Sequence, residues 1–495
     1  MNRPDWIIVG AGVAGCTLAR QLSSRSGHRV TIIEPSVAPD TDLPPTIDQQ
    51  RPSRWLKLMG SSDDWNLSTD PSEHLAGRKI VWPRGRGIGG SGRINAMIWF
   101  PPTESDFASW ESASGGRRLI GQWRQAYQAA ESIACPESPR WISEASRRFL
   151  SVAETLPDAE PMIYQRINRN GRRLDWTPML ENTDVVRATV DRVVFKGDRA
   201  VGVSIIKDGS RSELTSRCGV IMCAGSIATP TILMRSGIGD ARDLSAHGID
   251  VRVDRPTIGH QLKDHLVMPV IFETNFRDNF RLNPSPRDLA SWQVMGTGPV
   301  ASNVAESGGL FRGGDFQVHV TPTHYLTFPA DSAKPMMTIA INLTRPKSSG
   351  QITISSSDAC SQPSIQPKYL SDASDGDRLV SAVNDVRKLV AQSSLSQFIT
   401  KEVIPGKRRT DERSVRQAIA RFSQTLYHPV GSCRLGDQSD TPVDTDFRVR
   451  GTGGLWVADA SALPELPTGN PTAAVMTWAI MAADSIGASA NGVRG

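Results

Sequence analysis

Hydrophobic and polar positions near the N-terminus predict alternating strands and helices. Trp6 to Val9 form a short unbroken apolar run, which is typical of a parallel strand buried on both faces. A helix-like stretch from Cys16 to Leu22 follows, and a second strand is predicted from Arg29 to Ile33. From Asp184 to Val203, Val, Ala and Phe alternate with polar residues, which predicts further strands.

The second half of the chain has a different pattern. Strand-like runs such as 317–320 and 336–343 are separated by Pro and Gly between Leu266 and Phe422. The apolar stretch from Ala473 to Ile486 then predicts a buried helix. Between residues 131 and 182 the chain is polar, rich in Arg and only weakly periodic. The chain is therefore expected to combine a strand–helix unit with a separate group of strands.

Length and composition narrow the class of protein. A chain of 495 residues exceeds what one hydrophobic core usually organises, so we expect two domains. The 39% of hydrophobic and 22% of charged residues are typical of a globular protein, and no apolar run of about 18 residues predicts a membrane span. The net charge of +5 comes without a Lys/Arg block and does not indicate nucleic-acid binding.

Cysteine spacing and the N-terminus exclude further classes. The six Cys lack CxxC pairs and Cys/His spacing, so neither a zinc site nor a disulfide scaffold is expected. The first residues lack the charged and apolar regions of an export signal, so we expect a cytoplasmic protein.

A glycine motif directly follows the first predicted strand. Gly10, Gly12 and Gly15 form GxGxxG at the start of the following helix. Gly10 permits the tight turn, Gly12 lets the backbone approach a pyrophosphate, and Gly15 allows the helix to pack closely on the strand. Glu34 ends the second strand at the offset of about twenty residues where an acid accepts ribose hydroxyls. The motif predicts a dinucleotide site, disfavours NADP and leaves NAD and FAD open.

A second glycine-rich loop, Pro83 to Met97, follows a Pro-rich connector. So many Gly residues are costly in ordinary structure, and Ile88 and Ile94 do not fit a flexible surface turn. We expect a loop whose backbone lies flat against a ligand and which leads into a helix at Asn95.

This loop resembles the first signature of the glucose-methanol-choline oxidoreductases, and Asp106 to Trp110 resembles the element that follows it in that family. The segment from Gly225 to Gly239 resembles the second signature. The similarity covers nearly the whole chain, because it continues through the segments 259–265, 345–350, 427–433, 454–461 and 469–471.

The resemblance implies a bound FAD and an α/β fold combined with antiparallel β structure. A Rossmann-like, discontinuous FAD-binding domain would comprise residues 1–130, 184–265 and 425–490. A substrate-binding domain built on an antiparallel sheet would comprise residues 131–183 and 266–424. The chain is short for the family, chiefly between residues 131 and 184, which leaves the oligomeric state open.

The resemblance also assigns residues to the parts of FAD. The first glycine motif would hold the pyrophosphate, Glu34 the ribose and the main chain of Val190 the adenine. The second glycine loop would lie against the isoalloxazine ring, and the segments around Asp459 and Asn470 would meet the ribityl chain and the pyrimidine end. The residues expected to bind the cofactor are Gly10, Gly12, Gly15, Glu34, Gly90, Ser91, Asn95, Val190, Asp459, Ala460 and Thr472.

Three positions of the second loop depart from the family pattern. Gly92 and Arg93 replace a Ser and its neighbour, which places a long cation near the entrance to the site. Arg93 is expected either to bind an anionic substrate or to face solvent or phosphate. Some members bind FAD covalently through a His at the position of Ile94, so non-covalent FAD is expected here.

Alcohol oxidation by a flavin sends a hydride to the flavin N5 and the hydroxyl proton to a base. A His suits this step near neutral pH, and positioned general-base catalysis contributes about 10² to 10⁴ in rate. Among eight His residues, His428 matches the catalytic His of the family. Asn470 matches the His or Asn that holds the substrate hydroxyl, and it also suits a cap for a helix beginning at Pro471. Glu465, the alternative base, is expected on a solvated loop.

The other histidines have simpler interpretations. His260 and His265 flank Asp264, which is expected to pair with one of them structurally. His319 and His324 lie in the predicted substrate domain, where pocket-lining, core and surface roles all stay open.

The sequence therefore predicts an FAD-dependent enzyme that oxidises a CH–OH group to an aldehyde or ketone, with His428 as general base and Asn470 as its partner. A small-molecule alcohol is the expected substrate. The electron acceptor is expected to be a quinone-like compound, a protein or oxygen rather than NAD(P). The alternative is a flavin-containing lyase or another non-redox enzyme of the fold, in which His428 transfers protons.

Overall fold

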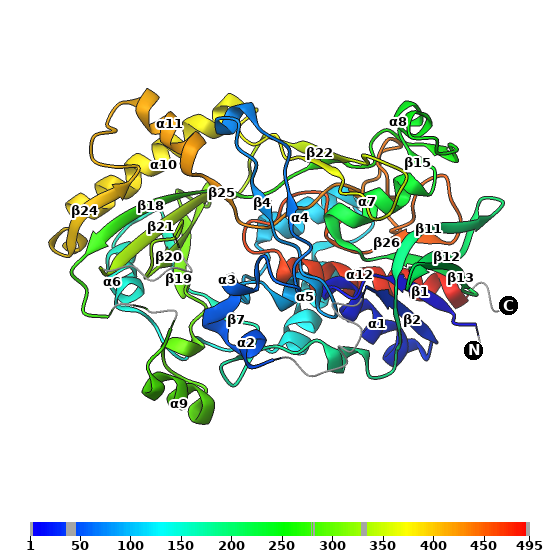
Figure 1. Ribbon diagram of the computed structural model, residues 1–495, viewed down its shortest axis with the longest axis horizontal. Coiled ribbons are helices and arrows are strands. Elements are labelled where there is room, and N and C mark those ends of the chain that lie inside the picture. The colour runs from blue at the N-terminus through cyan, green and yellow to red at the C-terminus, as the bar shows by residue number, and fades with distance from the viewer. Residues whose placement is uncertain (1–2, 36–45, 279, 281–282, 328–333, 492–495) are drawn as a thin grey trace.

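The computed structural model describes residues 3–35, 46–278, 280, 283–327 and 334–491. Figure 1 shows a parallel sheet beside the two chain termini and an antiparallel sheet toward the opposite end of the long axis. Segments from both halves of the chain contribute to each region, so the chain crosses between the two regions more than once.

The parallel sheet has five strands in the order β10-β2-β1-β14-β26. Its strands are β1 (Trp6–Val9), β2 (Val30–Glu34), β10 (Asp184–Arg187), β14 (Gly219–Met222) and β26 (Leu455–Val457). Every residue of β1 and β14 is buried, as expected for parallel strands that are covered on both faces. The sheet therefore joins the N-terminal unit to a strand near the C-terminus.

Helix α1 (Val13–Ser26) connects β1 to β2, which confirms the predicted strand–helix–strand unit. It ends at Gly27, whose φ of 59° gives a left-handed C-cap. Helix α12 (Thr472–Asn491) packs against α1 and against α5 (Ile120–Ala134). Trp123 of α5 stacks on Trp478 of α12 with ring centroids 5.0 Å apart, which holds α12 in place.

The second sheet has seven strands, all in antiparallel pairs. Five of its strands follow each other along the path β24-β18-β21-β20-β19, β6 lies at the far edge, and β25 pairs with β18. Their bounds are β6 (Ala159–Ile163), β18 (Leu266–Thr274), β19 (Ser307–Phe311), β20 (Phe316–Thr321), β21 (Met336–Leu343), β24 (Ile399–Ile404) and β25 (Gln424–Thr425).

The two faces of this sheet differ in chemistry. Helices α6 (Glu144–Ala153) and α10 (Ala373–Gln392) pack on one face, where Phe316 and Val318 of β20 join the hydrophobic core. Because side chains alternate along a strand, Gln317 and His319 point to the other face. The predicted fold class, α/β combined with antiparallel β structure, is confirmed. The predicted domain boundaries stay a prediction.

Smaller sheets complete the fold. One contains β11 (Thr189–Lys196), β12 (Arg199–Lys207) and β13 (Ser210–Thr215), and another contains β17 (His260–Leu262), β22 (Gly350–Thr353) and β23 (Ser364–Gln366). The other α-helices of the described residues are α2 (Ile47–Gln50), α3 (Trp55–Leu58), α4 (Glu104–Ala113), α7 (Gly225–Arg235), α8 (Ala241–Ala246), α9 (Pro286–Met295) and α11 (Glu412–Phe422).

The expectation of a helix at Asn95 is wrong. The second glycine loop forms a single 3₁₀ turn, Gly90–Arg93, and then enters strand β5 (Ile98–Trp99). Gly89 and Gly90 have positive φ, and the Asn95 side chain accepts a hydrogen bond from Met97 N at 3.0 Å. Such local bonds from Asn favour a turn over a continuing helix.

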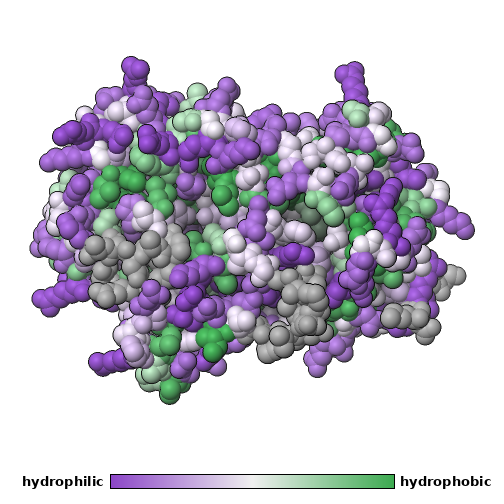
Figure 2. All heavy atoms as spheres, in the orientation of Figure 1, coloured by the Kyte–Doolittle hydropathy of each residue, from purple (hydrophilic) through white to green (hydrophobic). Residues whose placement is uncertain are grey.

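Figure 2 shows polar and charged side chains over much of the face in view, with hydrophobic side chains in separate patches. Val294 and Met295 of α9 are exposed apolar residues. Within the described part of the chain, no helix is long and apolar enough to cross a membrane. In the same residues no group of three or more His, Cys, Asp or Glu is arranged to hold a metal ion. All six cysteines are free thiols.

Candidate active site

A cavity of about 640 Å³ lies between the parallel sheet and the polar face of the antiparallel sheet. It is lined by Gly10, Glu34 and Asp459, which follow or end parallel strands at their carboxyl ends. His428 and Asn470 line the same cavity. Its volume is within the usual range of ligand sites, about 300 to 1,000 Å³. Ligands of doubly wound sheets bind at this edge of the strands.

The first turn of α1 is suited to bind phosphate. Gly12 and Val13 line the cavity, and the helix begins without a side-chain cap or an acidic residue. The unpaired N–H groups of a helix N-terminus and its dipole bind anions. A Cβ on Gly12 would meet no protein atom within 4 Å, whereas a Cβ on Gly15 would lie 1.9 Å from the carbonyl oxygen of Gly10. Gly12 therefore leaves room for a ligand, and Gly15 permits contact between helix and strand.

Glu34 joins the two glycine loops. Its carboxylate accepts hydrogen bonds from Ala11 N at 2.8 Å and from Gly87 N at 2.9 Å. Burial raises the pKa of Glu34 to about 7, although the two amide donors oppose this shift. A carboxylate can accept about four hydrogen bonds, so it retains capacity for ribose hydroxyls. The link between the loops was not predicted, because the sequence does not reveal that they touch.

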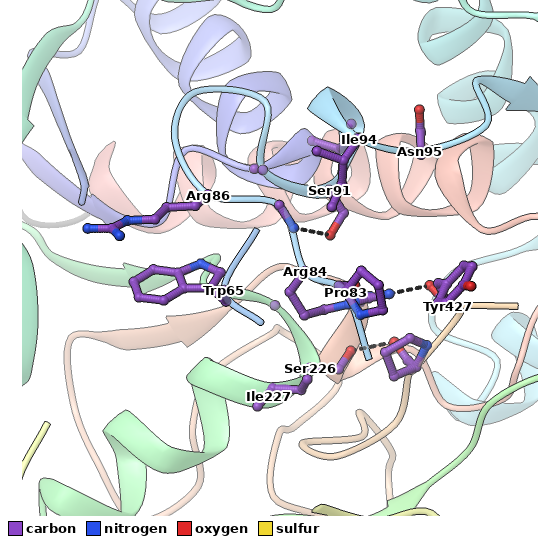
Figure 3. A pocket seen from close by; sticks show the side chains of 18 of the residues that line it. Trp65, Pro83, Arg84, Arg86, Ser91, Ile94, Asn95, Ser226, Ile227 and Tyr427 are labelled. Carbon is purple, nitrogen blue, oxygen red and sulfur yellow. Dashed lines mark hydrogen bonds between the residues drawn. The ribbon is translucent and has the colours of Figure 1, made fainter. Parts of the chain in front are cut away.

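The second glycine loop lies directly against the first. A Cβ on Gly90 would come within 2.8 Å of the Cα of Gly12. Ser91 Oγ accepts a hydrogen bond from Gly85 N at 3.2 Å, and Arg173 donates to Asn95 Oδ1 at 2.9 Å. Figure 3 shows Ser91 and Asn95 on this loop where it borders the cavity. The loop thus forms a fixed wall, as expected for a backbone that lies against a ring.

Arg93 is directed away from the cavity. Its guanidinium donates to Asp63 Oδ1 at 2.8 Å and to the carbonyl of Ile88 at 3.3 Å. The side chain does not line the cavity in the described residues. The structure therefore does not bring Arg93 to the site, because a neighbouring carboxylate already pairs with it.

Asp459 fixes the loop after β26. One carboxylate oxygen accepts from Gly225 N at 2.7 Å and from Thr229 Oγ1 at 2.6 Å, and the other accepts from Ser461 N at 2.8 Å. Burial raises the pKa of Asp459, and these hydrogen bonds oppose the shift. The carboxylate thus organises the backbone at the start of α7 and of the following 3₁₀ turn.

The remaining expected cofactor residues also line the cavity. Val190 lies on β11, where it pairs with Ile205 of β12. Ala460 and Thr472 border the cavity as well, and Thr472 is the first residue of α12. The N-terminus of α12 therefore opens on the cavity, and its dipole favours negative charge there.

The structure brings His428 and Asn470 together. Asn470 Nδ2 lies 3.2 Å from His428 Nε2, and Asn470 Oδ1 lies 3.3 Å from His319 Nε2 and 3.5 Å from Gln317 Nε2. His319 lines the cavity, so the pocket interpretation holds for this residue. Glu465 instead forms an ion pair with Lys263 at 2.6 Å and does not line the cavity.

His265 is a further member of this cluster. Its Nδ1 lies 2.9 Å from His428 Nδ1, and its Nε2 lies 3.2 Å from the carbonyl oxygen of Thr344. The expectation that Asp264 pairs with a neighbouring His ring is wrong. The carboxylate of Asp264 accepts from the backbone N of His428 at 2.7 Å, from Thr425 Oγ1 at 2.6 Å and from the hydroxyl of Tyr369.

The three clustered histidines are neutral near neutral pH. Burial lowers the pKa of His265 to about 3 and that of His319 to about 4. Burial, and then the neighbouring His265, His319 and Arg84, lowers the pKa of His428 well below its ordinary value. A neutral imidazole has one ring nitrogen with a free lone pair, so it is able to act as a base.

The backbone directly before His428 is strained. Tyr427 has a φ of 67°, in the left-handed region that costs about 1–2 kcal/mol for a residue with a Cβ. Thr425 Oγ1 accepts from Tyr427 N at 2.7 Å, and Arg84 donates to the Tyr427 carbonyl at 2.7 Å, as Figure 3 shows for the Arg84 side chain. These bonds hold a conformation that the chain would otherwise avoid, next to the proposed base.

An irregular strand pair explains the turn at Tyr427. Leu266 pairs with Thr425, and Lys263 forms an antiparallel bridge with Val430. The 425–430 side of this pair therefore carries two more residues than the 263–266 side, which is a β-bulge. Bulges next to active sites change the direction of a side chain.

Comparisons with known proteins agree with this geometry. Family models described as GMC oxidoreductase match residues 4–183 and 173–267, and residues 346–479. An uncharacterized GMC-type oxidoreductase of Mycobacterium tuberculosis is 31% identical over 98% of this chain and 99% of its own length. An alcohol dehydrogenase (acceptor) of Pseudomonas putida is 30% identical over 97% of this chain and 95% of its own length.

A solved structure has the same fold over nearly its full length. Pyridoxine 4-oxidase from Mesorbium loti superposes with a TM-score of 0.86 and 27% identity, over 97% of this chain and 98% of that chain. Matches of this extent, together with the two joined glycine loops and the His428–Asn470 pair, show that the chain belongs to the GMC oxidoreductase family.

Proposed function

We propose that this chain oxidises an alcohol to an aldehyde or ketone, with FAD as its cofactor and His428 as the general base. The observation that supports this most strongly is the pair formed by His428 Nε2 and Asn470 Nδ2, which lie 3.2 Å apart and line the cavity. A neutral imidazole nitrogen beside an amide donor suits a substrate hydroxyl, which needs an acceptor for its proton and a donor for its oxygen.

Each side chain has a separate task in the proposed reaction. Bound FAD supplies the acceptor for the hydride that leaves the carbinol carbon. In the structure Asn470 Nδ2 donates to the one lone pair of His428 Nε2, and the substrate hydroxyl would replace it there. His428 Nε2 then takes the hydroxyl proton, and Asn470 Nδ2 donates to the oxygen as negative charge grows on it. His319 and Gln317 hold the opposite end of the Asn470 amide. Since His428 is buried, water has little access to the proton that is transferred.

The names of the relatives support the same class of reaction. The Pseudomonas putida relative is an alcohol dehydrogenase that uses an acceptor, and the structural neighbour is an oxidase of pyridoxine. The first supports an alcohol as substrate. Because one is a dehydrogenase and the other an oxidase, the two names together support a CH–OH donor rather than one particular electron acceptor.

We further propose that the substrate is an alcohol without a positive charge. Among the described residues that line the cavity, the carboxylates are those of Glu34 and Asp459, and the cationic side chains are those of Arg84, Arg86 and Arg235. Both carboxylates already accept hydrogen bonds from backbone amides. A buried cation without a counter-ion is costly, so the site disfavours a cationic substrate.

Anaerobic mixing tests the redox assignment. A panel of alcohols should bleach the oxidised flavin of the purified holoenzyme, and the amount of aldehyde or ketone should match the amount of flavin reduced. Turnover of a substrate with the flavin still oxidised would instead support the lyase alternative. If no class of alcohol reduces the flavin, the proposed function is refuted.

The base is tested by His428→Asn beside the matched control His74→Asn, since His74 is exposed on the surface. We expect His428→Asn to retain FAD and to slow flavin reduction by about 10² to 10⁴, and the control to reduce at the wild-type rate. An unchanged rate in His428→Asn would exclude His428 as the base.

A matched substrate pair tests the charge preference. Choline and its uncharged isostere, in which a carbon replaces the quaternary nitrogen, have nearly the same shape. The isostere should reduce the flavin at least about tenfold more efficiently, because only choline buries an unpaired cation. Equal efficiency, or a preference for choline, would contradict the proposal of a substrate without a positive charge.

A further inference from the structure

A backbone carbonyl anchors a chain of hydrogen bonds beneath His428. The Thr344 carbonyl oxygen can only accept, and it lies 3.2 Å from His265 Nε2. A neutral imidazole carries one proton, so His265 must hold it on Nε2 and leave Nδ1 as an acceptor. The side chain of His265 is fully buried, and burial lowers its pKa to about 3, which supports the neutral form.

The acceptor on His265 decides where His428 carries its proton. The two Nδ1 atoms lie 2.9 Å apart, with the rings at 80° to each other. Two lone pairs at this distance would repel, so His428 Nδ1 must be the donor. His428 Nε2 is then unprotonated, and it faces Asn470 Nδ2, an amide nitrogen that can only donate.

At the Asn470 end of the network, the hydrogen bonds run in the direction that this tautomer of His428 requires. Asn470 Oδ1 can only accept, and it lies within hydrogen-bond distance of the ring N–H of His319 and the side-chain amide of Gln317. The opposite tautomer of His428 would place a lone pair against the lone pair of His265. Turning the Asn470 amide around would not remove that conflict, because it lies on the other side of the ring.

We propose that His265 is a positioning residue that fixes the tautomer of His428, so that the Nε2 lone pair faces Asn470 and the substrate hydroxyl. When His428 takes a proton, His265 Nδ1 continues to accept the Nδ1–H of the imidazolium. This role usually belongs to a carboxylate. Here Asp264, the carboxylate beside His428, accepts from the main-chain N–H and leaves the ring to His265.

Other charged or titratable groups near His428 do not supply this orientation. Besides His265 and Asp264, these groups are His319, which is neutral near neutral pH, and Arg84, whose positive charge lowers the pKa of His428. His319 contacts the Asn470 amide, and Arg84 donates to the carbonyl of Tyr427. The effect of His265 on rate rests on the proposed function, whereas the tautomer of His428 is measurable without any substrate.

Nitrogen NMR of the holoenzyme labelled with ¹⁵N-histidine tests the tautomer directly. The His428 signals, assigned by their loss in His428→Asn, should show a proton on Nδ1 and a free lone pair on Nε2. His265→Asn and His265→Leu form a matched pair of nearly equal shape, since only Asn keeps an acceptor near the position of Nδ1.

The two variants should differ in chemistry rather than in folding. We expect His265→Asn to keep the His428 tautomer and to reduce the flavin within about threefold of the wild-type rate, and His265→Leu to show mixed tautomers and at least a tenfold slower reduction. FAD content and substrate affinity should stay unchanged in both variants. The acid limb of the rate profile should move in His265→Leu but not in His265→Asn.

Two results would overturn the inference. One is a wild-type spectrum with the His428 proton on Nε2, and the other is equal rates and equal tautomers in the Asn and Leu variants. If His265→Leu fails to fold, the wild-type and His265→Asn spectra still decide the tautomer. If no alcohol reduces the wild-type flavin, the proposed function fails, while the NMR result continues to test the role of His265.

Discussion

Replacing Asp264 by Asn should both destabilise the protein and slow flavin reduction. Asp264 is buried, and its carboxylate accepts from His428 N at 2.7 Å, from Thr425 Oγ1 at 2.6 Å and from the Tyr369 hydroxyl. Asn keeps the shape and one acceptor oxygen, but it removes the charge. Its amide nitrogen would face the two hydroxyl groups that now donate to the carboxylate.

The magnitude follows from these three bonds. A hydrogen bond to a charged group contributes about 1.5–3 kcal/mol, and a neutral one about 0.5–1.5 kcal/mol. Weakening the three hydrogen bonds destabilises the folded protein by more than is gained by burying a neutral amide in place of a charged carboxylate. That gain is real, because burial raises the pKa of Asp264 and so disfavours its charged form. We expect the free energy of unfolding to fall by about 2–3 kcal/mol.

The effect on rate arises from the strained turn at Tyr427. Its left-handed φ costs about 1–2 kcal/mol and is held partly by the bond between Asp264 and the next backbone N–H. A weakened bond lets the turn relax, which moves the His428 ring away from Asn470. Since about 1.4 kcal/mol changes an equilibrium tenfold, flavin reduction should fall by about ten- to thirtyfold.

Asp375→Asn is the matched control. Asp375 is equally buried and accepts from Lys347 N at 3.0 Å and Ser348 N at 2.8 Å, but it does not line the cavity. Urea unfolding should show a loss in both variants, and anaerobic stopped-flow mixing should show slower flavin reduction in Asp264→Asn alone. A wild-type rate in Asp264→Asn, or an equal loss of rate in both variants, would refute the link between Asp264 and the position of His428.

Three further predictions address the glycine motif and the histidines. Gly12→Ala should keep the wild-type melting temperature, because its Cβ would touch no protein atom, but it should bind FAD at least about tenfold more weakly in a titration, because the Cβ would occupy the space left for the cofactor. Gly15→Ala should unfold, because its Cβ would lie 1.9 Å from the Gly10 carbonyl oxygen. Folding holds the pKa of His265 at about 3 and that of His319 at about 4, below the unfolded value of about 6.5. The stability that the two neutral rings contribute is therefore complete above pH 6.5 and is lost as the pH falls from 6.5 toward 4. In this pH range urea unfolding should show a loss of about 1.4 kcal/mol per pH unit for each of the two residues, and His319→Asn should remove the share of His319. Burial lowers the pKa of His428, so the acid limb of the flavin-reduction profile should lie below pH 6.5, and a limb at or above 6.5 would contradict the buried, neutral base.

Local pattern was sufficient to predict much of the fold. The run 336–343 was predicted as a strand and coincides with β21. The helix predicted after the first glycines exists as α1, although it begins at Val13 rather than at Cys16. Both signals depend only on neighbouring residues. The pairing of β14 with β1 and β26, and the contact of the two glycine loops through Glu34, depend on residues far apart in the chain and were not predictable from local pattern.

The second glycine loop shows that composition alone does not predict backbone conformation. Its apolar residues and the polar Asn95 suggested the start of a helix, but Met97, two residues later, adopts a φ of 56°. A positive φ is incompatible with a continuing right-handed helix. The sequence carried no sign that a residue with a side chain would adopt this conformation just after Asn95.

The neighbouring pair Asp264 and His265 shows why the candidate site needed the tertiary structure. Adjacency in sequence suggested that Asp264 and His265 pair with each other. In an extended segment, however, successive side chains point to opposite faces, so the two side chains cannot contact the same group of His428. Asp264 therefore reaches the main chain of His428, and His265 reaches its ring. His428 can contact both Asp264 and His265 only because the bulge at Tyr427 turns its backbone N–H and its ring in different directions. The strained residue thus explains the position of the proposed base. The sequence, in which Tyr427 appears as an ordinary residue before His428, carries no local sign of that strain.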